Sequence, residues 1–203
     1  MNLPQLTLVI LAGGQASRMH GIDKGLITVA GQPMVQHVLT RLAADTRPTV
    51  LISNRNQAQY QALGHPVYAD EIPDYAGPLA GICRGLQVAT TPFVLVVPCD
   101  TPCLPVDLAE RMLAQQQQDQ ADIVIACDEQ QNHPVIMLLR RELRDSLEQF
   151  LASGERKVIR WCQQHHLVFC KFAGQATAFA NINTPEQQQL LEQQLLSNNP
   201  RFL

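Results

Sequence analysis

A glycine pair followed by two cations is the part of this chain best suited to chemistry. Gly13 and Gly14 follow an apolar run, Arg18 comes four residues after Gly14, and Lys24 comes six residues further on. Paired glycines let backbone N–H groups approach a ligand where a side chain would collide. Arginine adds a planar fork for phosphate oxygens, and lysine adds a compact charge. The pattern predicts a phosphate-binding loop; the alternative is a tight turn beside ordinary surface charges.

The loop departs from the two common nucleotide-binding patterns. It contains neither the Gly-x-Gly-x-x-Gly of dinucleotide folds nor Gly-x-x-x-x-Gly-Lys-Ser/Thr. The glycines alone would therefore be weak evidence for a nucleotide. The two cations at these spacings are what strengthen the prediction.

An aspartate follows the most apolar run of the chain. Asp100 stands in Val-Pro-Cys-Asp-Thr-Pro directly after residues 93–97, which are all apolar. Ligands of open α/β sheets gather at the carboxyl ends of the strands, so we expect Asp100 and the glycine loop to share one crevice. Mg²⁺ needs only one or two carboxylates when phosphate oxygens and water complete its shell. The alternative interpretation of Asp100 is a helix cap.

The elements that position these groups alternate between apolar runs and segments of helical period, which is typical of βα units around a mostly parallel sheet. Residues 122–127 and 134–139, joined by a polar turn, are expected to form a hairpin instead. We therefore predict an α/β, single-domain Rossmann-like fold with helices on both faces of the sheet and an antiparallel element toward the C-terminus. We expect strands at 6–11, 50–52, 67–69, 93–97, 122–127, 134–139 and 167–172, and helices beginning near 33, 57, 77, 105, 141, 156 and 185.

Composition narrows the class of protein. Hydrophobic residues make up 46% of the 203 and charged residues 16%, which excludes a disordered chain. A net charge of −3 disfavours a nucleic-acid partner. No apolar run approaches the ~20 residues that span a bilayer, and the N-terminus has no signal-like core, so we expect no membrane association and a cytoplasmic location. The six scattered cysteines are interpreted as reduced, and the many glutamines, at 115–118 and 187–189 among others, as solvated helix faces.

Taken together, Leu-Ala-Gly-Gly, Arg-Met, Asp-Lys-Gly-Leu and Gly-Gln-Pro-Met resemble the N-terminal signature of nucleotidyltransferases that activate sugars and cofactors. The Asp-Lys-Gly-Leu form, with Asp70 before Pro-Asp-Tyr-Ala-Gly-Pro-Leu-Ala-Gly and with Pro-Cys-Asp-Thr-Pro, resembles the molybdenum cofactor guanylyltransferases. The likeness runs from about residue 6 to 184, with its three blocks in the family's order. It implies one domain over 1–203, with a nucleotide half at about 1–104 and an acceptor half at about 105–203.

The resemblance implies an enzyme that transfers GMP from GTP to the terminal phosphate of molybdopterin and releases pyrophosphate. It assigns catalysis to Arg18, Lys24 and Asp100, with Asp100 holding Mg²⁺. The implied GTP-binding residues are Leu11, Ala12, Gly13, Gly14, Lys24, Asn54, Asp70, Gly77, Gly81 and Asp100. The family often has asparagine where this chain has Ile52, and Asn54 is the nearest substitute. Gly77 and Gly81 can equally be explained by the start of a helix.

The acceptor side is implied by His133-Pro134 and by later segments. Arg156 and Lys157 would hold the pterin phosphate, and Asn181 and Asn183 would meet the pterin edge. The alternatives are plain helix-surface charges and a helix start. Expected partners are GTP, molybdopterin or molybdenum cofactor, and proteins of cofactor insertion and molybdoenzyme maturation, with the chain a monomer. The other functions left open are a cytidylyl or sugar-phosphate nucleotidyltransferase, and a non-catalytic nucleotide-binding escort protein.

Overall fold

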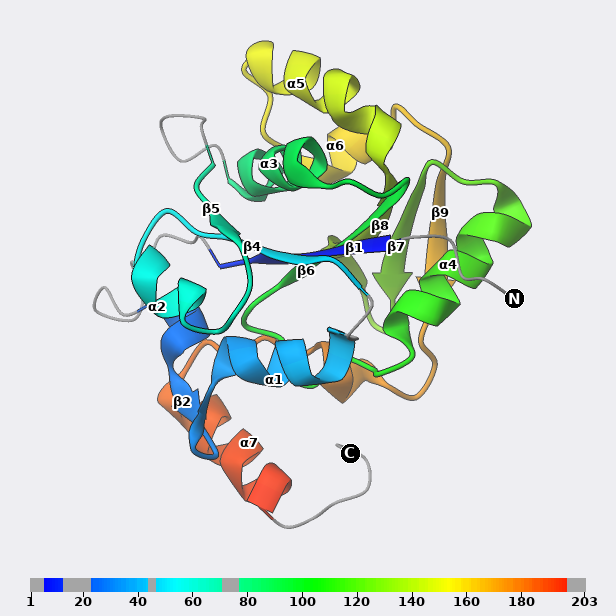
Figure 1. Ribbon diagram of the computed structural model, residues 1–203. Helices are drawn as coiled ribbons and strands as arrows, with labels where there is room; N and C mark the ends of the chain where they lie inside the picture. The colour runs from blue at the N-terminus through cyan, green and yellow to red at the C-terminus, as the bar shows by residue number, and fades with distance from the viewer. Residues whose placement is uncertain (1–5, 13–22, 44–46, 71–76, 197–203) are drawn as a thin grey trace.

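The computed structural model describes residues 6–12, 23–43, 47–70 and 77–196, and within them the chain forms a seven-stranded sheet of order β5-β4-β1-β6-β8-β7-β9 (Figure 1). Only β8 runs against its neighbours, β6 and β7, and the other pairs are parallel. The predicted α/β fold with a late antiparallel hairpin is confirmed. In sheet order the strands are Val67–Tyr68, Thr49–Ile52, Leu6–Leu11, Phe93–Pro98, Asn132–Arg140, Ile123–Cys127 and Leu167–Lys171.

Helices cover both faces of the sheet (Figure 1). On one face lie α3 (Pro78–Val88), α5 (Arg144–Ala152) and α6 (Val158–Cys162), and on the other lie α1 (Met34–Leu42) and α4 (Leu108–Asp119). The short helix α2 (Gln57–Gln61) joins the second layer through one buried residue, Tyr60. Successive side chains of a strand point to opposite faces, so both must be apolar in a strand covered twice. This accounts for the unbroken apolar run of β6.

Several boundaries differ from expectation. Helix α4 begins at Leu108 and not at Pro105, because residues 105–107 form a turn in which Leu108 N donates to Pro105 O at 3.1 Å. A small hairpin, β2 (Thr28–Val29) with β3 (Gln32–Pro33), was not predicted. Its strands of two residues are too short for any periodic signal. Both turn residues between them have positive φ, as two-residue hairpins favour.

The last helix, α7 (Pro185–Leu196), lies beside β2 (Figure 1). Gln188 Nε2 donates to Thr28 O at 2.8 Å, and Ala30 N donates to Glu192 Oε1 at 3.0 Å. Two of the chain's glutamine-rich segments thus contain structural contacts, since Gln116 of α4 is also buried and donates to Ala121 O. The expectation of a solvated helix face is wrong for Gln116, which is buried. No helix in the described ranges is both long and apolar enough to cross a membrane.

The β7–β8 hairpin is closed by a carboxylate. Asp128 Oδ1 accepts the N–H groups of Gln130 at 2.6 Å and Gln131 at 2.9 Å, and Oδ2 lies 2.9 Å from His133 Nε2. The Gln130 N–H, with the Gln131 N–H and His133, holds the pKa of Asp128 below its ordinary value. The His133 ring stacks on Phe179 at 4.7 Å. The hairpin turn therefore anchors the 3₁₀ helix η3 (Ala176–Phe179), which leads to Asn181.

Gly85 tests the packing of α3 on the sheet. A Cβ at Gly85 would lie 2.8 Å from Val9 Cγ1. We expect Gly85→Ala to lower the free energy of unfolding by about 1–3 kcal/mol, because crowding outweighs the ~1 kcal/mol that alanine gains over glycine in a helix. Urea denaturation measures the change. In a Val9→Ala background the methyl group has room, so there Gly85→Ala should stabilise; an equal loss in both backgrounds would contradict the crowding.

Asp128 predicts a pH-dependent stability. Because its folded pKa is depressed, the charge stabilises the fold above the unfolded pKa of about 4, and that stabilisation is lost as the pH falls through the lower folded pKa. Wild type should be more stable than Asp128→Asn at about pH 7, and the difference should shrink toward about pH 3. Urea denaturation across this range measures it. A difference that stays constant with pH would show that the carboxylate charge does not contribute.

Candidate functional site

Lys24 begins a short 3₁₀ turn that its neighbour caps. The turn η1 (Lys24–Leu26) is preceded by Asp23, whose Oδ1 accepts the Gly25 N–H at 3.2 Å. The side chain of Lys24 is 28% exposed. The segment Asp-Lys-Gly-Leu singled out in the sequence is thus a capped turn that presents one cation.

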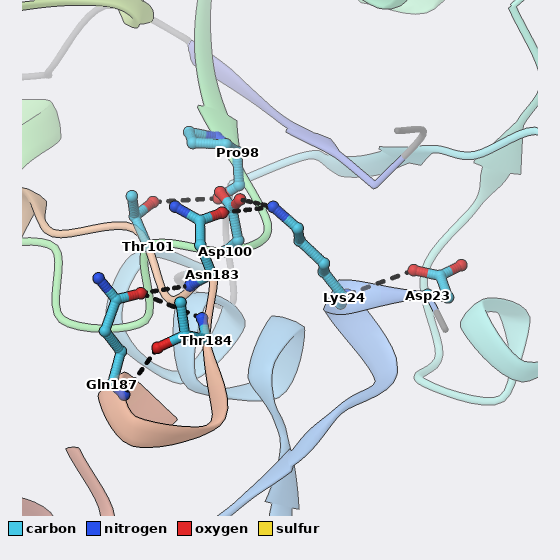
Figure 2. A network of polar contacts seen from close by, with 9 residues as sticks. Asp23, Lys24, Pro98, Asp100, Thr101, Asn183, Thr184 and Gln187 are labelled. Carbon is cyan, nitrogen blue, oxygen red and sulfur yellow. Dashed lines mark hydrogen bonds and ion pairs between the residues drawn. The ribbon is translucent and has the colours of Figure 1, made fainter. Parts of the chain in front are cut away.

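Asp100 lies where β6 ends. Cys99 N donates to Leu11 O at 3.0 Å, so the segment after β6 is tied to the end of β1. The Asp100 side chain is 14% exposed, and its Oδ2 lies 3.4 Å from Lys24 Nζ (Figure 2). Burial, and then the charge of Asp100, raise the pKa of the Cys99 thiol well above its usual value. The thiol next to Asp100 is therefore uncharged. The structure brings Lys24 and Asp100 together at the strand ends, as the sequence predicted.

A third segment, from the C-terminal part of the chain, joins this pair. Lys24 Nζ donates to Asn183 Oδ1 (Figure 2). In addition, Ile182 N donates to Asp100 O at 2.9 Å. Gln187 Oε1 accepts the N–H groups of Asn183 at 2.7 Å and Thr184 at 3.2 Å, which holds the loop at the start of α7. Asn183, expected on the acceptor side, therefore lies against Lys24. Asn181 is exposed two residues earlier.

A second polar pair follows β4 and β5. Asn54 Nδ2 donates to Asp70 Oδ2 at 2.9 Å, and Asp70 N donates to Asn54 Oδ1 at 2.9 Å. Ile52, by contrast, is buried in β4 and is only 2% exposed. The amide that contacts Asp70 thus comes from Asn54 and not from position 52. Among the described residues no protein donor contacts Asp70 Oδ1, so this oxygen can still accept a hydrogen bond.

The glycine loop itself is described only at its edge. Leu11 is the last residue of β1, and Ala12, which follows it, donates its N–H to Ile52 O at 2.8 Å. Gly13, Gly14 and Arg18 lie outside the described residues. Their predicted roles remain predictions.

The second glycine segment opens α3. Gly77 is exposed and has φ +73°, a conformation that glycine adopts without strain. A Cβ at Gly81 would lie 3.0 Å from Leu11 Cδ2 and 3.6 Å from Ile52 Cγ2. Close packing of α3 on β1 and β4 therefore accounts for Gly81 without a ligand. The sequence offered the start of a helix as the alternative to a ligand contact, and did not foresee this packing of Gly81.

The predicted acceptor cations lie between α5 and α6. Arg156 Nη1 donates to Leu151 O and Glu155 O, each at 2.8 Å, and so closes the carboxyl end of α5. Lys157 is exposed and precedes α6. Both residues lie in the connection between two helices on the α3 side of the sheet. Their phosphate-binding role remains a prediction.

The sequence did not single out Tyr60 and Asn56, which contact the Lys24 turn. Tyr60 Oη donates to Asp23 Oδ1 at 2.5 Å, and Asn56 Nδ2 donates to Asp23 Oδ2 at 3.2 Å. One signal was available, since Tyr60 is the only large apolar side chain in the short helix Gln-Ala-Gln-Tyr-Gln. A lone aromatic residue in so polar a helix indicates a specific burial site.

Asp100 fits a divalent cation of the kind that nucleotides carry. No three His, Cys, Asp or Glu side chains in the described ranges lie together as an all-protein metal site requires. A Mg²⁺ ion held by one carboxylate takes its other ligands from phosphate oxygens and water. The donor set thus suits a metal that is shared with a nucleotide.

A cavity of about 520 Å³ opens at the opposite edge of the sheet, where β6 begins and β8 ends. It lies at the amino ends of the parallel strands. Ligands of such sheets bind at the carboxyl ends, so we assign the site to the Lys24 edge. The cavity is lined by Thr90, Thr91, Pro92, Phe93, Arg140, Arg141, Glu142, Arg144 and Asp145.

Comparison with solved structures supports the fold. The molybdopterin-guanine dinucleotide biosynthesis protein A from Archaeoglobus fulgidus superposes with a TM-score of 0.74 at 19% identity, over 94% of this chain and 99% of that one. At this identity the likeness shows a common fold and nothing finer.

Sequence comparisons show the family. Residues 8–168 match the MobA-like NTP transferase domain. The molybdenum cofactor guanylyltransferase of Shewanella sediminis (strain HAW-EB3) is 45% identical over 189 residues, 93% of this chain and 96% of the relative. That of Shewanella frigidimarina (strain NCIMB 400) is 46% identical over 192 residues, 95% of this chain and 98% of the relative. This chain therefore belongs to the molybdenum cofactor guanylyltransferase family of nucleotidyltransferases.

Proposed function

We propose that this protein transfers GMP from GTP to the terminal phosphate of molybdopterin and releases pyrophosphate. The observation that carries the proposal is the convergence of Lys24, Asp100 and Asn183 at the carboxyl ends of β1 and β6. The lysine cation can bind a phosphate, and the carboxylate can bind a metal ion. The asparagine amide can hydrogen-bond to a polar acceptor substrate. Family membership supplies the substrate class.

The chemistry is an in-line displacement. An oxygen of the molybdopterin phosphate forms a bond to the α-phosphorus of GTP, and the bond from that phosphorus to the oxygen bridging the β-phosphate breaks. The attacking phosphate is already ionised, so no general base is needed. Lys24 and Arg18 would neutralise charge that builds on the α-phosphate, and alignment supplies the rest.

The nucleotide would lie along the ends of β1, β4 and β5. Leu11 is the last residue of β1 and Ala12 follows it, and the remaining Asp70 oxygen can accept from a base or ribose donor. Guanine offers two adjacent donors, N1–H and the 2-amino group. Asn54 would orient Asp70 through their two hydrogen bonds. Gly77 and Gly81, at the start of α3, would form the border of this part of the site.

Mg²⁺ would be held by Asp100 with oxygens of the triphosphate. When bound, it neutralises phosphate charge and orients the leaving pyrophosphate. The protein's contribution is to hold the Asp100 carboxylate at the end of β6 through the Cys99 and Ile182 backbone bonds. Lys24, which pairs with that carboxylate, is close enough to act on the same triphosphate.

Asn181 and Asn183 would face the pterin, and Arg156 with Lys157 would hold its phosphate. Asn183 is the best supported of the four, because it already contacts Lys24. The division into nucleotide and acceptor halves, the monomeric state, the cytoplasmic location and the partners in cofactor insertion remain predictions. The competing functions are another nucleotidyltransferase reaction and a non-catalytic escort protein.

Asp100 is the first test. We expect Asp100→Asn to keep the fold and to lose at least about a hundredfold in turnover, since removal of one group that stabilises the transition state costs ~3 kcal/mol and the metal anchor is lost with it. Pyrophosphate release with GTP, Mg²⁺ and molybdopterin measures it. Asp107→Asn is the matched control, because the Asp107 carboxylate is exposed and its ion pair with Arg111, at 3.9 Å, is long and weak. Near-normal turnover of folded Asp100→Asn would refute the assignment.

Nucleotide choice is the second test. GTP with Mg²⁺ should raise the melting temperature most among the four nucleoside triphosphates, because a ligand at about a hundred times its Kd stabilises by about 2.7 kcal/mol. Differential scanning fluorimetry measures the shift. A preference for CTP would favour the cytidylyl alternative. GTP binding without any pyrophosphate release in the presence of acceptor would favour the escort protein.

A further inference from the structure

A buried phenol supports the turn that presents Lys24. Tyr60 of α2 has 0% exposure, and its hydroxyl donates to Asp23 Oδ1 at 2.5 Å. Burial, and then Cys99 and Asp23, raise the pKa of Tyr60 above its usual range, so the hydroxyl keeps its proton and remains a donor. Within the described part of the chain Asp23 is the one hydrogen-bond partner of this hydroxyl, so the hydroxyl depends on Asp23 for its hydrogen bond.

Asp23 connects the Tyr60 hydroxyl to the backbone of the Lys24 turn. The oxygen that accepts from Tyr60 also accepts the Gly25 N–H, at 3.2 Å, and the second oxygen accepts from Asn56 at 3.2 Å. Asp23 therefore links the start of α2 to the first backbone amide after Lys24. This linkage caps a turn too short to hold its shape by its own hydrogen bonds.

The turn is also clamped sterically. A Cβ at Gly25 would lie 2.5 Å from Tyr60 Oη and 3.1 Å from Cys99 Sγ. The backbone after Lys24 is thus packed between the phenol and the residue that precedes Asp100. The distance from the Lys24 backbone to Asp100 is set by this packing.

We propose that Tyr60 is a positioning residue, which acts through Asp23 to hold the Lys24 backbone at a fixed place beside Asp100. The proposal rests on the proposed function only in assigning Lys24 a role in turnover. The Lys24 side chain is long and partly exposed, so its ammonium group reaches the reacting phosphate reliably only if its backbone is fixed. Misplacement of a transition-state contact lowers kcat more than it raises KM.

The test removes the hydroxyl alone. Tyr60→Phe should lower kcat about tenfold to a hundredfold, with little change in the KM for molybdopterin. The matched control is Thr7→Val, which removes another buried hydroxyl bond, 2.6 Å to Thr91 Oγ1, at the far end of β1. Thr7→Val should lose stability and keep kcat. Equal kcat losses in both variants would mean that general stability is responsible and would overturn the proposal.

Substitutions at Asp23 separate positioning from charge. Asp23→Asn keeps an oxygen that can accept from both Tyr60 and Gly25, and the exposed Asn56 amide can turn so that its oxygen accepts from the new NH2 group. Asp23→Asn should therefore retain most of the kcat that Asp23→Ala loses. If Asp23→Asn falls as far as Asp23→Ala, the negative charge itself is required and the positioning role is overturned.

Amide hydrogen exchange measures the local stability of the Lys24 turn independently of enzyme activity. The Gly25 amide should exchange faster in Tyr60→Phe than in wild type, and should be unchanged in Thr7→Val. Failure of wild type to transfer GMP would refute the proposed function, while this measurement would still report on the turn. Unchanged Gly25 exchange in Tyr60→Phe, or faster exchange with full kcat, would overturn the proposal.

Discussion

The parallel pairing of β1 with β6 is the constraint on which the site depends. Their register aligns Leu11 with Pro98, so both strands end at the same edge, and the Cys99 N–H bonds to the Leu11 carbonyl just beyond. This pairing places Asp100 next to the end of β1, after which the glycine segment follows in the chain. The pairing is secured by burial on both faces, because Val94, Leu95, Val96 and Val97 are all fully buried.

Both the backbone and the side chain of Lys24 are held by neighbouring residues. Its backbone is fixed by Asp23 and the packed Gly25, whereas its ammonium group bonds to Asp100 and Asn183. The ion pair is partly solvated and contributes little stability by itself. In the proposed function its value is geometric, since a cation and a carboxylate that already face each other would take up opposite parts of a metal–triphosphate group without large rearrangement.

The C-terminal segment completes the site from outside the sheet. Ile182 bonds to the Asp100 carbonyl and packs with Val29, Met34, Cys103 and Leu191 in a small separate apolar cluster. Helix α7 then follows the β2–β3 hairpin through Gln188 and Glu192. A segment expected to serve the acceptor thus also supports the β2–β3 hairpin, which follows Lys24 in the chain.

What the sequence determined by itself is local. Apolar runs and helical periods predicted the sheet and most helices, and the Asp-Lys-Gly-Leu and Pro-Cys-Asp-Thr-Pro segments marked Lys24 and Asp100, because strand ends collect ligands in this class of fold. Only the tertiary structure decided that Asn183 contacts Lys24, that Asn54 pairs with Asp70, that Gly81 serves packing, and that Tyr60 supports Asp23. These contacts join residues far apart in the chain, and their energies depend on burial and direction, which no local pattern of residue types encodes.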